Sequence, residues 1–473
     1  MKSPKKNGIL RKKADGVVKM NSKYEINTNE NREFLKASCE DLLNFGHRFP
    51  SPNGGSYYLG DDGTPWKDRN RETWITCRMV HVYSLGLMLG HEGSGELVDA
   101  ALKGLKGELH DDKNGGWYAG VTPEGGIVPN KQCYAHAFVI LAASSALTAG
   151  RPGAKELLEE ALDVYDQHFW NEEEGLACDT WNTEFTVLDD YRGLNANMHT
   201  VEAFLAAGDV TGDKKYHIRA GRIIDHVIQW AEDNSWRIPE HFTKEWVADL
   251  DCNRDRPDDP FKPYGATPGH GIEWARLITQ WTLANCGEEK EKLEKHLQAA
   301  ENLYTTAIKD GWNADGAPGI VYTTDWNGKP VVHDRMHWTL AEARTLRGCA
   351  QRDTCPLRRK AEPRHRAADD LRRLCHAQRL FGRRQDTTAR KYLRIWIILG
   401  KHGITHTALL QVFCCALGRK CSKHSLAARC VGRVKAHAAE HARAVFLPRV
   451  PIADQSLQND PSPQKSSPPV YGG

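Results

Sequence analysis

Hydrophobic and polar residues follow a helical spacing through most of the chain. Between about Glu30 and Ala343, apolar residues recur at i, i+3, i+4 and i+7, and segments rich in Gly, Asp and Asn interrupt the pattern. The spacing predicts helices over Trp74–Leu89, Ser94–Leu109, Cys133–Ala149, Ala154–Phe169, Ala196–Val210, Lys215–Asn234, Gly271–Cys286, Lys290–Ile308 and Trp338–Ala343. Few stretches alternate with a period of two, and Gly319–Thr323 is one short candidate strand.

The predicted helices come in pairs on a cycle of roughly fifty residues, which indicates helical hairpins in series. Such hairpins stack as an open solenoid or close into an all-α toroid. Thirteen of the 14 Trp residues fall outside residues 344–443, many of them beside His, Arg or Glu. Aromatic faces pack against the C–H faces of sugars, so this content favours a toroid around a carbohydrate. The alternative is that Trp fills a helical core.

Charge divides the chain unevenly. Residues 344–443 carry 24 Lys and Arg against 6 Asp and Glu, a net charge of +18, whereas the remaining residues carry 40 against 55, a net charge of −15. The same block holds 7 of the 13 Cys. We therefore expect four segments: 1–29 as a basic, disordered extension, 30–343 as a catalytic domain, 344–443 as an anomalous basic block and 444–473 as a separate end with a disordered tail.

Several classes of protein are disfavoured by the sequence. No apolar run approaches about 18 residues, so we expect no membrane span. The N-terminus is basic but lacks the apolar segment of a secretory signal. The cysteines are scattered and form no C-x-x-C pair, which fits free thiols and a cytoplasmic location.

Polar and aromatic residues at helical spacing mark a candidate site. Trp74, Arg78 and His81 share one helix face. Tyr134 and His136 form a second cluster, for which a satisfied core pair is the alternative.

Two further clusters combine histidine with a carboxylate. Asn195 and His199 open a predicted helix, and ordinary capping also explains the Asn. In T-P-G-H-G-I-E, His270 and Glu273 lie at i and i+3, where the carboxylate would fix the imidazole tautomer. His199 and Glu202 repeat this spacing.

Together with His241 of R-I-P-E-H-F, these clusters predict histidines at helix ends and turns around one cavity: His81, His136, His199, His241 and His270. Neutral imidazoles near pH 7 suit proton transfer. Metal-binding patterns are weak, because no H-E-x-x-H occurs and the single E-x-x-H, at 362–365, contains Pro363. We expect neither a metal nor another cofactor.

Five segments resemble the N-acylglucosamine 2-epimerase family, most closely its bacterial mannose and sulfoquinovose aldose–ketose isomerases. They are W-I-T-C-R-M-V-H-V-Y (74–83), N-A-N-M-H-T-V-E-A-F (195–204), P-E-H-F (239–242), T-P-G-H-G-I-E-W-A-R-L (267–277) and G-I-V-Y-T-T-D-W-N-G-K-P-V-V (319–332). The similarity covers about residues 30–343. It implies an (α/α)6 barrel with a central sugar pocket and no metal cofactor.

The resemblance also implies roles for individual residues. Arg78 matches a substrate-binding arginine near the reacting carbons, and His199 a pocket histidine linked to ring opening. His270 matches one of two catalytic histidines, with Glu273 as its carboxylate partner. The positions that match pocket-lining or supporting residues are Trp74, Tyr134, Asn195, Glu240, Trp338 and Glu342.

The implied activity is an aldose–ketose isomerisation, between mannose and fructose, through a cis-enediol. A 2-epimerase is the runner-up, since only the carbon that is reprotonated differs. A glycoside hydrolase or lyase on the same toroid would need paired carboxylates, for which Glu240, Glu273 and Asp251 are available. A nucleic-acid-binding protein is suggested by the basic block alone, but its few aromatics and missing motifs argue against it. A homo-oligomer is compatible with the sequence.

The chain departs from the family pattern in two places. Pro260 stands where the sulfoquinovose branch has an arginine, so we expect a neutral hexose rather than a sulfonated sugar. The family pattern also stops after residue 343 and resumes at 444–453, as a pair of compensating frameshifts would produce. Glu440 occupies the place of the second catalytic histidine, so we assign that role to no residue.

Overall fold

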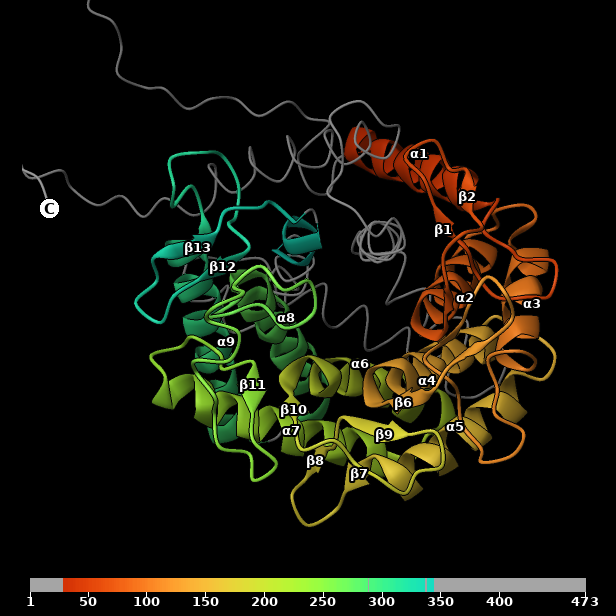
Figure 1. Ribbon diagram of the computed structural model, residues 1–473. Coiled ribbons are helices and arrows are strands. Elements are labelled where there is room, and N and C mark those ends of the chain that lie inside the picture. The colour runs from red at the N-terminus through yellow and green to blue at the C-terminus, as the bar shows by residue number, and fades with distance from the viewer. Residues whose placement is uncertain (1–28, 288, 337, 344–473) are drawn as a thin grey trace, which may run out of the picture.

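The helices of the described part of the chain are arranged around a ring (Figure 1). The computed structural model describes residues 29–287, 289–336 and 338–343. Its helices are α1 (Asn29–Gly46), α2 (Thr73–Met88), α3 (Ser94–Leu105), α4 (Cys133–Thr148), α5 (Ala154–His168), α6 (Leu194–Thr211), α7 (Lys214–Asp233), α8 (Pro268–Asn285) and α9 (Lys290–Gly311), with a short helical stretch at 338–343. This arrangement confirms the predicted all-α toroid of helical hairpins, of the (α/α)6 type.

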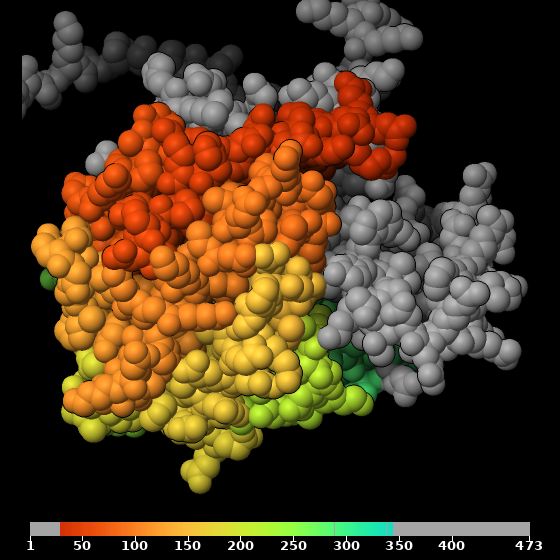
Figure 2. Space-filling model, turned by 90° about the vertical axis from the view of Figure 1, so that its right-hand side faces the viewer, coloured from red at the N-terminus to blue at the C-terminus, as the bar shows by residue number. Residues whose placement is uncertain are grey.

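The helices form an inner and an outer layer. Helices α2, α4 and α6 pack side by side with α8 following α6, and each packs against the outer helix that succeeds it in the chain, α3, α5, α7 or α9. Inner helices such as α4 (C-Y-A-H-A-F-V-I-L-A-A-S-S-A-L-T) carry almost no charge, because both of their faces are covered. Outer helices such as α7 bury one apolar stripe and expose charged residues. From the side, α1, α3 and α5 succeed one another down the molecule (Figure 2).

Short antiparallel strands connect the helices. They are β1 (Tyr58–Leu59), β2 (Pro65–Trp66), β3 (Arg71–Glu72), β4 (Gly120–Val121), β5 (Ile127–Val128), β6 (Asn130–Gln132), β7 (Trp170–Asn171), β8 (Leu176–Ala177), β9 (Thr180–Asn182), β10 (Arg192–Gly193), β11 (His241–Phe242), β12 (Thr323–Thr324) and β13 (Pro330–Val332). Strands β3, β6 and β10 end directly before α2, α4 and α6. Their pairing with β4, β9 and β11 therefore fixes where each inner helix begins.

The predicted helices are confirmed with small changes at their ends. Ser94–Leu109 is too long, because the chain turns after Leu105 around Gly107. Helix α1 was not predicted, and the candidate strand Gly319–Thr323 is wrong except for Thr323. The expectations for residues 1–28, for the basic block and for 444–473 lie outside the described residues. Among those that are described, no helix is long and apolar enough to cross a membrane.

A fully buried ion pair fastens the loop before α4. The side chains of Lys131 and Asp111 are both 0% exposed, and Lys131 Nζ lies 2.8 Å from Asp111 Oδ2 and 2.6 Å from the Gly115 carbonyl oxygen. The ammonium group also lies 4.7 Å from the centre of the Tyr118 ring. Because Lys131 lies in β6, two residues before α4 begins, this pair holds the 111–118 turn close to the start of an inner helix.

Replacing Lys131 by Met should lower the free energy of unfolding by about 3 kcal/mol or more, because it leaves the Asp111 carboxylate buried without its cation. Denaturant unfolding of the two proteins measures the change. Lys155→Met is the matched control: its pair with Glu159 is exposed, and losing it should cost less than about 0.5 kcal/mol. Equal losses for both variants would show that the buried pair does not fasten the loop.

Candidate active site

A cavity of about 560 Å³ opens at the N-terminal ends of the inner helices. The second residue of α2, α4 and α6 (Trp74, Tyr134 and Asn195) lines it in each case. Nine of the ten residues predicted for the site line this one cavity: Trp74, Arg78, Tyr134, Asn195, His199, Glu240, His270, Glu273 and Trp338. The tenth, Glu342, is buried and bonds to Arg276 instead. Nine residues predicted from the sequence therefore share one cavity, and what each residue does there is a separate question.

His270 is held by Glu240. Its Nδ1 lies 2.8 Å from Glu240 Oε1, so the N–H at Nδ1 donates to the carboxylate and Nε2 is left as the basic nitrogen. The predicted partnership of His270 with Glu273 is wrong. Side chains in a helix lean toward its N-terminus, and His270 lies in the first turn of α8. It therefore leans away from Glu273, one turn further on, and toward the segment before β11.

The T-P-G-H segment places the His270 ring. Pro268 starts α8, where a missing N–H costs nothing. A Cβ on Gly269 would lie 2.5 Å from the Trp338 ring, so only glycine allows this indole to rest on the first turn. The centres of the Trp338 and His270 rings are 5.3 Å apart. Trp338 thus covers one side of the imidazole while Glu240 holds its Nδ1.

His199 forms a second histidine–carboxylate pair, as predicted from the i, i+3 spacing. Its Nδ1 lies 2.8 Å from Glu202 Oε2, and the Tyr134 and Phe138 rings pack at 5.0 and 4.7 Å. Burial lowers the pKa of His199, and the hydrogen bond that its Nδ1–H donates to Glu202 opposes this only in part. The ring is therefore neutral at pH 7.

Arg78 places a buried positive charge beside these rings. The residue is 4% exposed, and its guanidinium donates to the Tyr134 hydroxyl at 3.1 Å. It lies 4.2 Å from the centre of the Phe138 ring and 5.6 Å from that of Trp74. The N-termini of the inner helices point at the same cavity and add partial positive charge. The site is therefore suited to an oxyanion.

Three carboxylates and Arg276 form a buried cluster behind the histidines. The guanidinium donates to Glu202 at 2.7 Å and to Glu342, and it lies 3.5 Å from Glu273. Burial favours a protonated Glu202, but Arg276 and His199 outweigh it and lower the pKa of that residue. Burial and then the charges of Glu342 and Glu202 raise the pKa of Glu273. Its surroundings therefore favour the protonated form of Glu273 on the cavity lining.

Ligand atoms of His199, Glu202 and Glu273 lie within 4.8 Å of one another, close enough to hold a metal ion. The Arg276 guanidinium already occupies the carboxylates of this group. A metal ion would therefore have to compete with a fixed cation.

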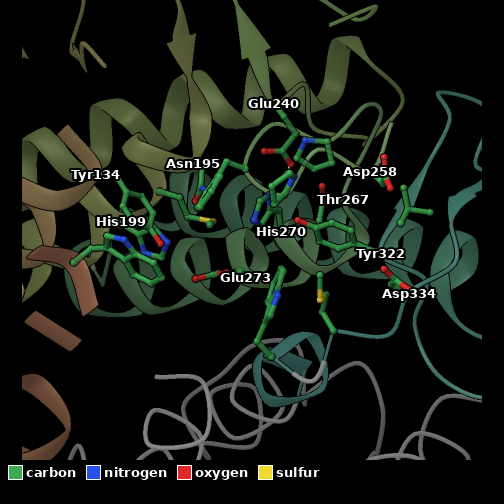
Figure 3. Close-up of a pocket in the computed structure, with 18 of the residues that line it drawn as sticks. Tyr134, Asn195, His199, Glu240, Asp258, Thr267, His270, Glu273, Tyr322 and Asp334 are labelled. Carbon is green, nitrogen blue, oxygen red and sulfur yellow. Dashed lines mark hydrogen bonds and ion pairs between the residues drawn. The ribbon is translucent and has the colours of Figure 1, made fainter. Parts of the chain in front are cut away.

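The opposite end of the cavity is acidic. Figure 3 shows Asp258 and Asp334 together at the end away from His199 and Tyr134, with Tyr322 beside them. Pro260, two residues after Asp258, also lines the cavity. It is the residue that the sequence analysis matched to an arginine of the sulfoquinovose branch. Lys262 does not replace it, because its Nζ lies 3.4 Å from the centre of the Tyr191 ring.

Two predicted histidines are wrong as cavity residues. His81 is in the middle of α2 and its Nδ1 bonds to Ser145 Oγ at 2.7 Å. His136 is buried in α4, where Nδ1 donates to the Gln132 carbonyl and Nε2 accepts from the Trp117 backbone N–H. Burial lowers the pKa of His136 to about 3. His136 is therefore a satisfied core histidine, the alternative already raised for the Tyr134–His136 pair, whereas His81 is half-buried and does not line the cavity.

Other lining residues were missed by the sequence analysis. Strand β1 contributes Tyr58, and loops contribute Arg69, Tyr191, Asp258, Tyr322 and Asp334. They follow no periodic pattern, and Tyr58 and Asp334 are 276 residues apart in the chain, so only the arrangement of the helices brings them together.

Comparisons with known proteins agree with this geometry. The family model described as "N-acylglucosamine 2-epimerase (GlcNAc 2-epimerase)" matches residues 54–386. A D-mannose isomerase of Thermobifida fusca is 41% identical over 324 residues, covering 66% of this chain and 76% of that protein. One of Marinomonas mediterranea is 30% identical over 322 residues, covering 66% and 79%.

Solved structures share the fold. A crystal structure of D-mannose isomerase superposes with a TM-score of 0.63 and 24% identity, covering 80% of this chain and 97% of that one. A cellobiose 2-epimerase of Bacillus thermoamylovorans gives a TM-score of 0.56 and 21% identity, covering 68% and 82%. On the family match and the sequence relatives, this chain belongs to the N-acylglucosamine 2-epimerase family of sugar isomerases and epimerases.

Proposed function

We propose that the protein interconverts D-mannose and D-fructose by moving a proton between C2 and C1 of the open-chain sugar. The observation that carries the proposal is the cavity itself. It combines two imidazoles oriented by carboxylates, His270 by Glu240 and His199 by Glu202, with the guanidinium of Arg78. The name D-mannose isomerase, given to relatives 41% identical to this chain, supports the choice of sugar.

The proposed step begins at His270. Its Nε2 takes the proton from C2, and the C–H electrons form the C1=C2 bond of a cis-enediolate with the negative charge on O1. Arg78 and the helix N-termini stabilise that charge. His270 then returns the proton to C1 while the O2 hydroxyl proton passes to O1, which yields the ketose without any oxidant or metal. A well-placed acid–base group contributes about 10²–10⁴-fold to the rate.

His199 and Glu273 take supporting roles in the proposal. The neutral His199 ring exchanges a proton with the ring oxygen and O1 when the hexose opens. Glu273, as a carboxylic acid, donates a hydrogen bond to a sugar oxygen near the reacting carbons. Arg276 holds the carboxyl groups of Glu202 and Glu273 in place without touching the sugar.

The same enediolate becomes the 2-epimer when the proton returns to the other face of C2. The match to the 2-epimerase family model keeps this as the second candidate. Glycoside hydrolysis is disfavoured, because it needs two carboxylates across the sugar. Glu240 is engaged by His270, and Asp251 is exposed and outside the cavity lining.

Incubation with mannose, glucose, fructose and N-acetylglucosamine in heavy water tests the reaction directly. Proton NMR should show solvent deuterium at C2 of mannose and C1 of fructose, together with conversion between them. His270→Ala should reduce exchange by about 10²–10⁴-fold, whereas His226→Ala on the outer helix α7 should leave it unchanged. If mannose gained deuterium at C2 and yielded glucose but no fructose, the protein would be an epimerase and not an isomerase. Exchange in none of the sugars would refute both activities.

The titration of His199 should reflect its burial. A histidine whose pKa is lowered stays neutral down to a lower pH, and it gains its proton only as pH falls through the lowered value. With the His199 signals identified by their absence in His199→Ala, nitrogen-15 NMR should show a His199 ring that stays neutral from about pH 8 to below 6.5, the ordinary pKa of histidine. Circular dichroism over the same range controls for unfolding. A His199 ring that gains a proton above pH 7 would contradict the neutral, buried His199.

The acidic end of the cavity should exclude anionic sugars. Asp258→Asn removes one of two carboxylates there, so the ratio of kcat/KM for mannose 6-phosphate to that for mannose should rise by about tenfold or less. Asp255→Asn is the matched control, since Asp255 is exposed in the same loop but does not line the cavity. An unchanged ratio in Asp258→Asn, or an equal rise in both variants, would show that Asp258 does not select against the anion.

A further inference from the structure

A third histidine lines the cavity but differs from the other two. His241 is 5% exposed, and both of its ring nitrogens are engaged by the protein. Nε2 lies 2.9 Å from the Pro263 carbonyl oxygen, which can only accept, so Nε2 carries the proton. Nδ1 lies 2.7 Å from the Tyr191 hydroxyl and accepts from it. Unlike His199 and His270, His241 therefore keeps no nitrogen for a substrate.

The bond to Pro263 anchors a loop. Residues 249–263 connect the β11 hairpin to α8, and we call them the wall loop. At the start of the wall loop, the Leu250 carbonyl accepts from the Trp326 indole at 2.7 Å. At its end, the Lys262 ammonium lies over the Tyr191 ring, the same ring whose hydroxyl holds His241. Tyr191 thus contacts both His241 and the wall loop.

The wall loop forms one side of the cavity. Asp258, Pro260 and Phe261 line the cavity, although Phe261 is 74% exposed. Within the loop, Asn253 donates to the Lys262 carbonyl at 2.7 Å, and Asp259 accepts from the Phe261 and Lys262 backbone N–H groups. The loop therefore keeps its own shape. Its contact with the helical ring depends on a few bonds, and those of His241 lie nearest to the cavity.

Two adjacent residues, Glu240 and His241, thus have different roles. Glu240 orients the imidazole of His270, while His241 holds the wall loop. The pairing of β10 with β11, Gly193 opposite His241, fixes both at once. We infer that His241, together with Tyr191, is a positioning residue that presses the wall loop against the bound sugar, and so governs sugar binding without transferring a proton. The inference rests on the proposed function for its substrate.

The experiment compares His241→Ala, His241→Gln and Tyr191→Phe with the unaltered protein. Kinetics with mannose separate KM from kcat, and hydrogen–deuterium exchange with mass spectrometry follows peptides of the wall loop. His226→Gln is the matched control, because His226 Nε2 also donates to a loop carbonyl, that of Glu174 at 2.9 Å, on the outer side of the ring.

We expect His241→Ala and Tyr191→Phe to raise KM by about tenfold and to change kcat by less than about threefold. Exchange should rise in 249–263 and stay unchanged in α8. His241→Gln, which keeps a donor for Pro263, should restore part of both effects, and His226→Gln should show neither.

A loss of kcat of about 10²-fold or more in Tyr191→Phe and His241→Gln, with KM unchanged, would assign His241 to proton transfer and overturn the inference. Unchanged exchange in the wall loop would overturn it as well. If the unaltered protein converts no sugar, the proposed function fails, and the exchange data alone decide whether His241 holds the wall loop.

Discussion

The site depends on the hydrogen bond between the His270 imidazole and the Glu240 carboxylate. It selects which nitrogen carries the proton and leaves the other one unprotonated. The two partners come from different parts of the fold. Glu240 directly precedes β11, which pairs with β10, and His270 lies in the first turn of α8. The close approach at Gly269 and the Trp338 ring then leave the imidazole little freedom to turn.

Charge balance explains why so many ionisable groups can be buried here. Arg276 lies among Glu202, Glu273 and Glu342, so one cation stabilises the carboxylates of this cluster, and the raised pKa of Glu273 reduces the negative charge that has to be buried. Glu202 in turn orients His199. The inner helices add the positive ends of their dipoles at the cavity, where an enediolate would carry its charge. At the other end, Asp258 and Asp334 place two carboxyl groups on the cavity lining.

Much of this could be predicted from the sequence, because helical periodicity is a local signal. The inner and outer helices and nine cavity residues follow from spacing and from the resemblance to one family. The partner of His270 could not be predicted, since an i, i+3 spacing describes proximity along a helix and not the direction of a side chain in its first turn. The prediction that His81 and His136 line the cavity was wrong for a similar reason. Spacing along the chain does not distinguish a histidine that is bonded within the protein from one that faces a cavity. The wall loop and its bond to His241 depend on contacts between distant segments, which no local pattern records.

Nitrogen-15 NMR of the imidazole tautomers tests the central claim most directly. With the His270 signals identified by their absence in His270→Ala, the account predicts a neutral ring protonated at Nδ1, with Nε2 unprotonated. In Glu240→Gln, where no carboxylate holds that proton, the preference should weaken or be lost. A His270 ring protonated at Nε2 in the unaltered protein, or a tautomer that does not respond to Glu240→Gln, would contradict the account.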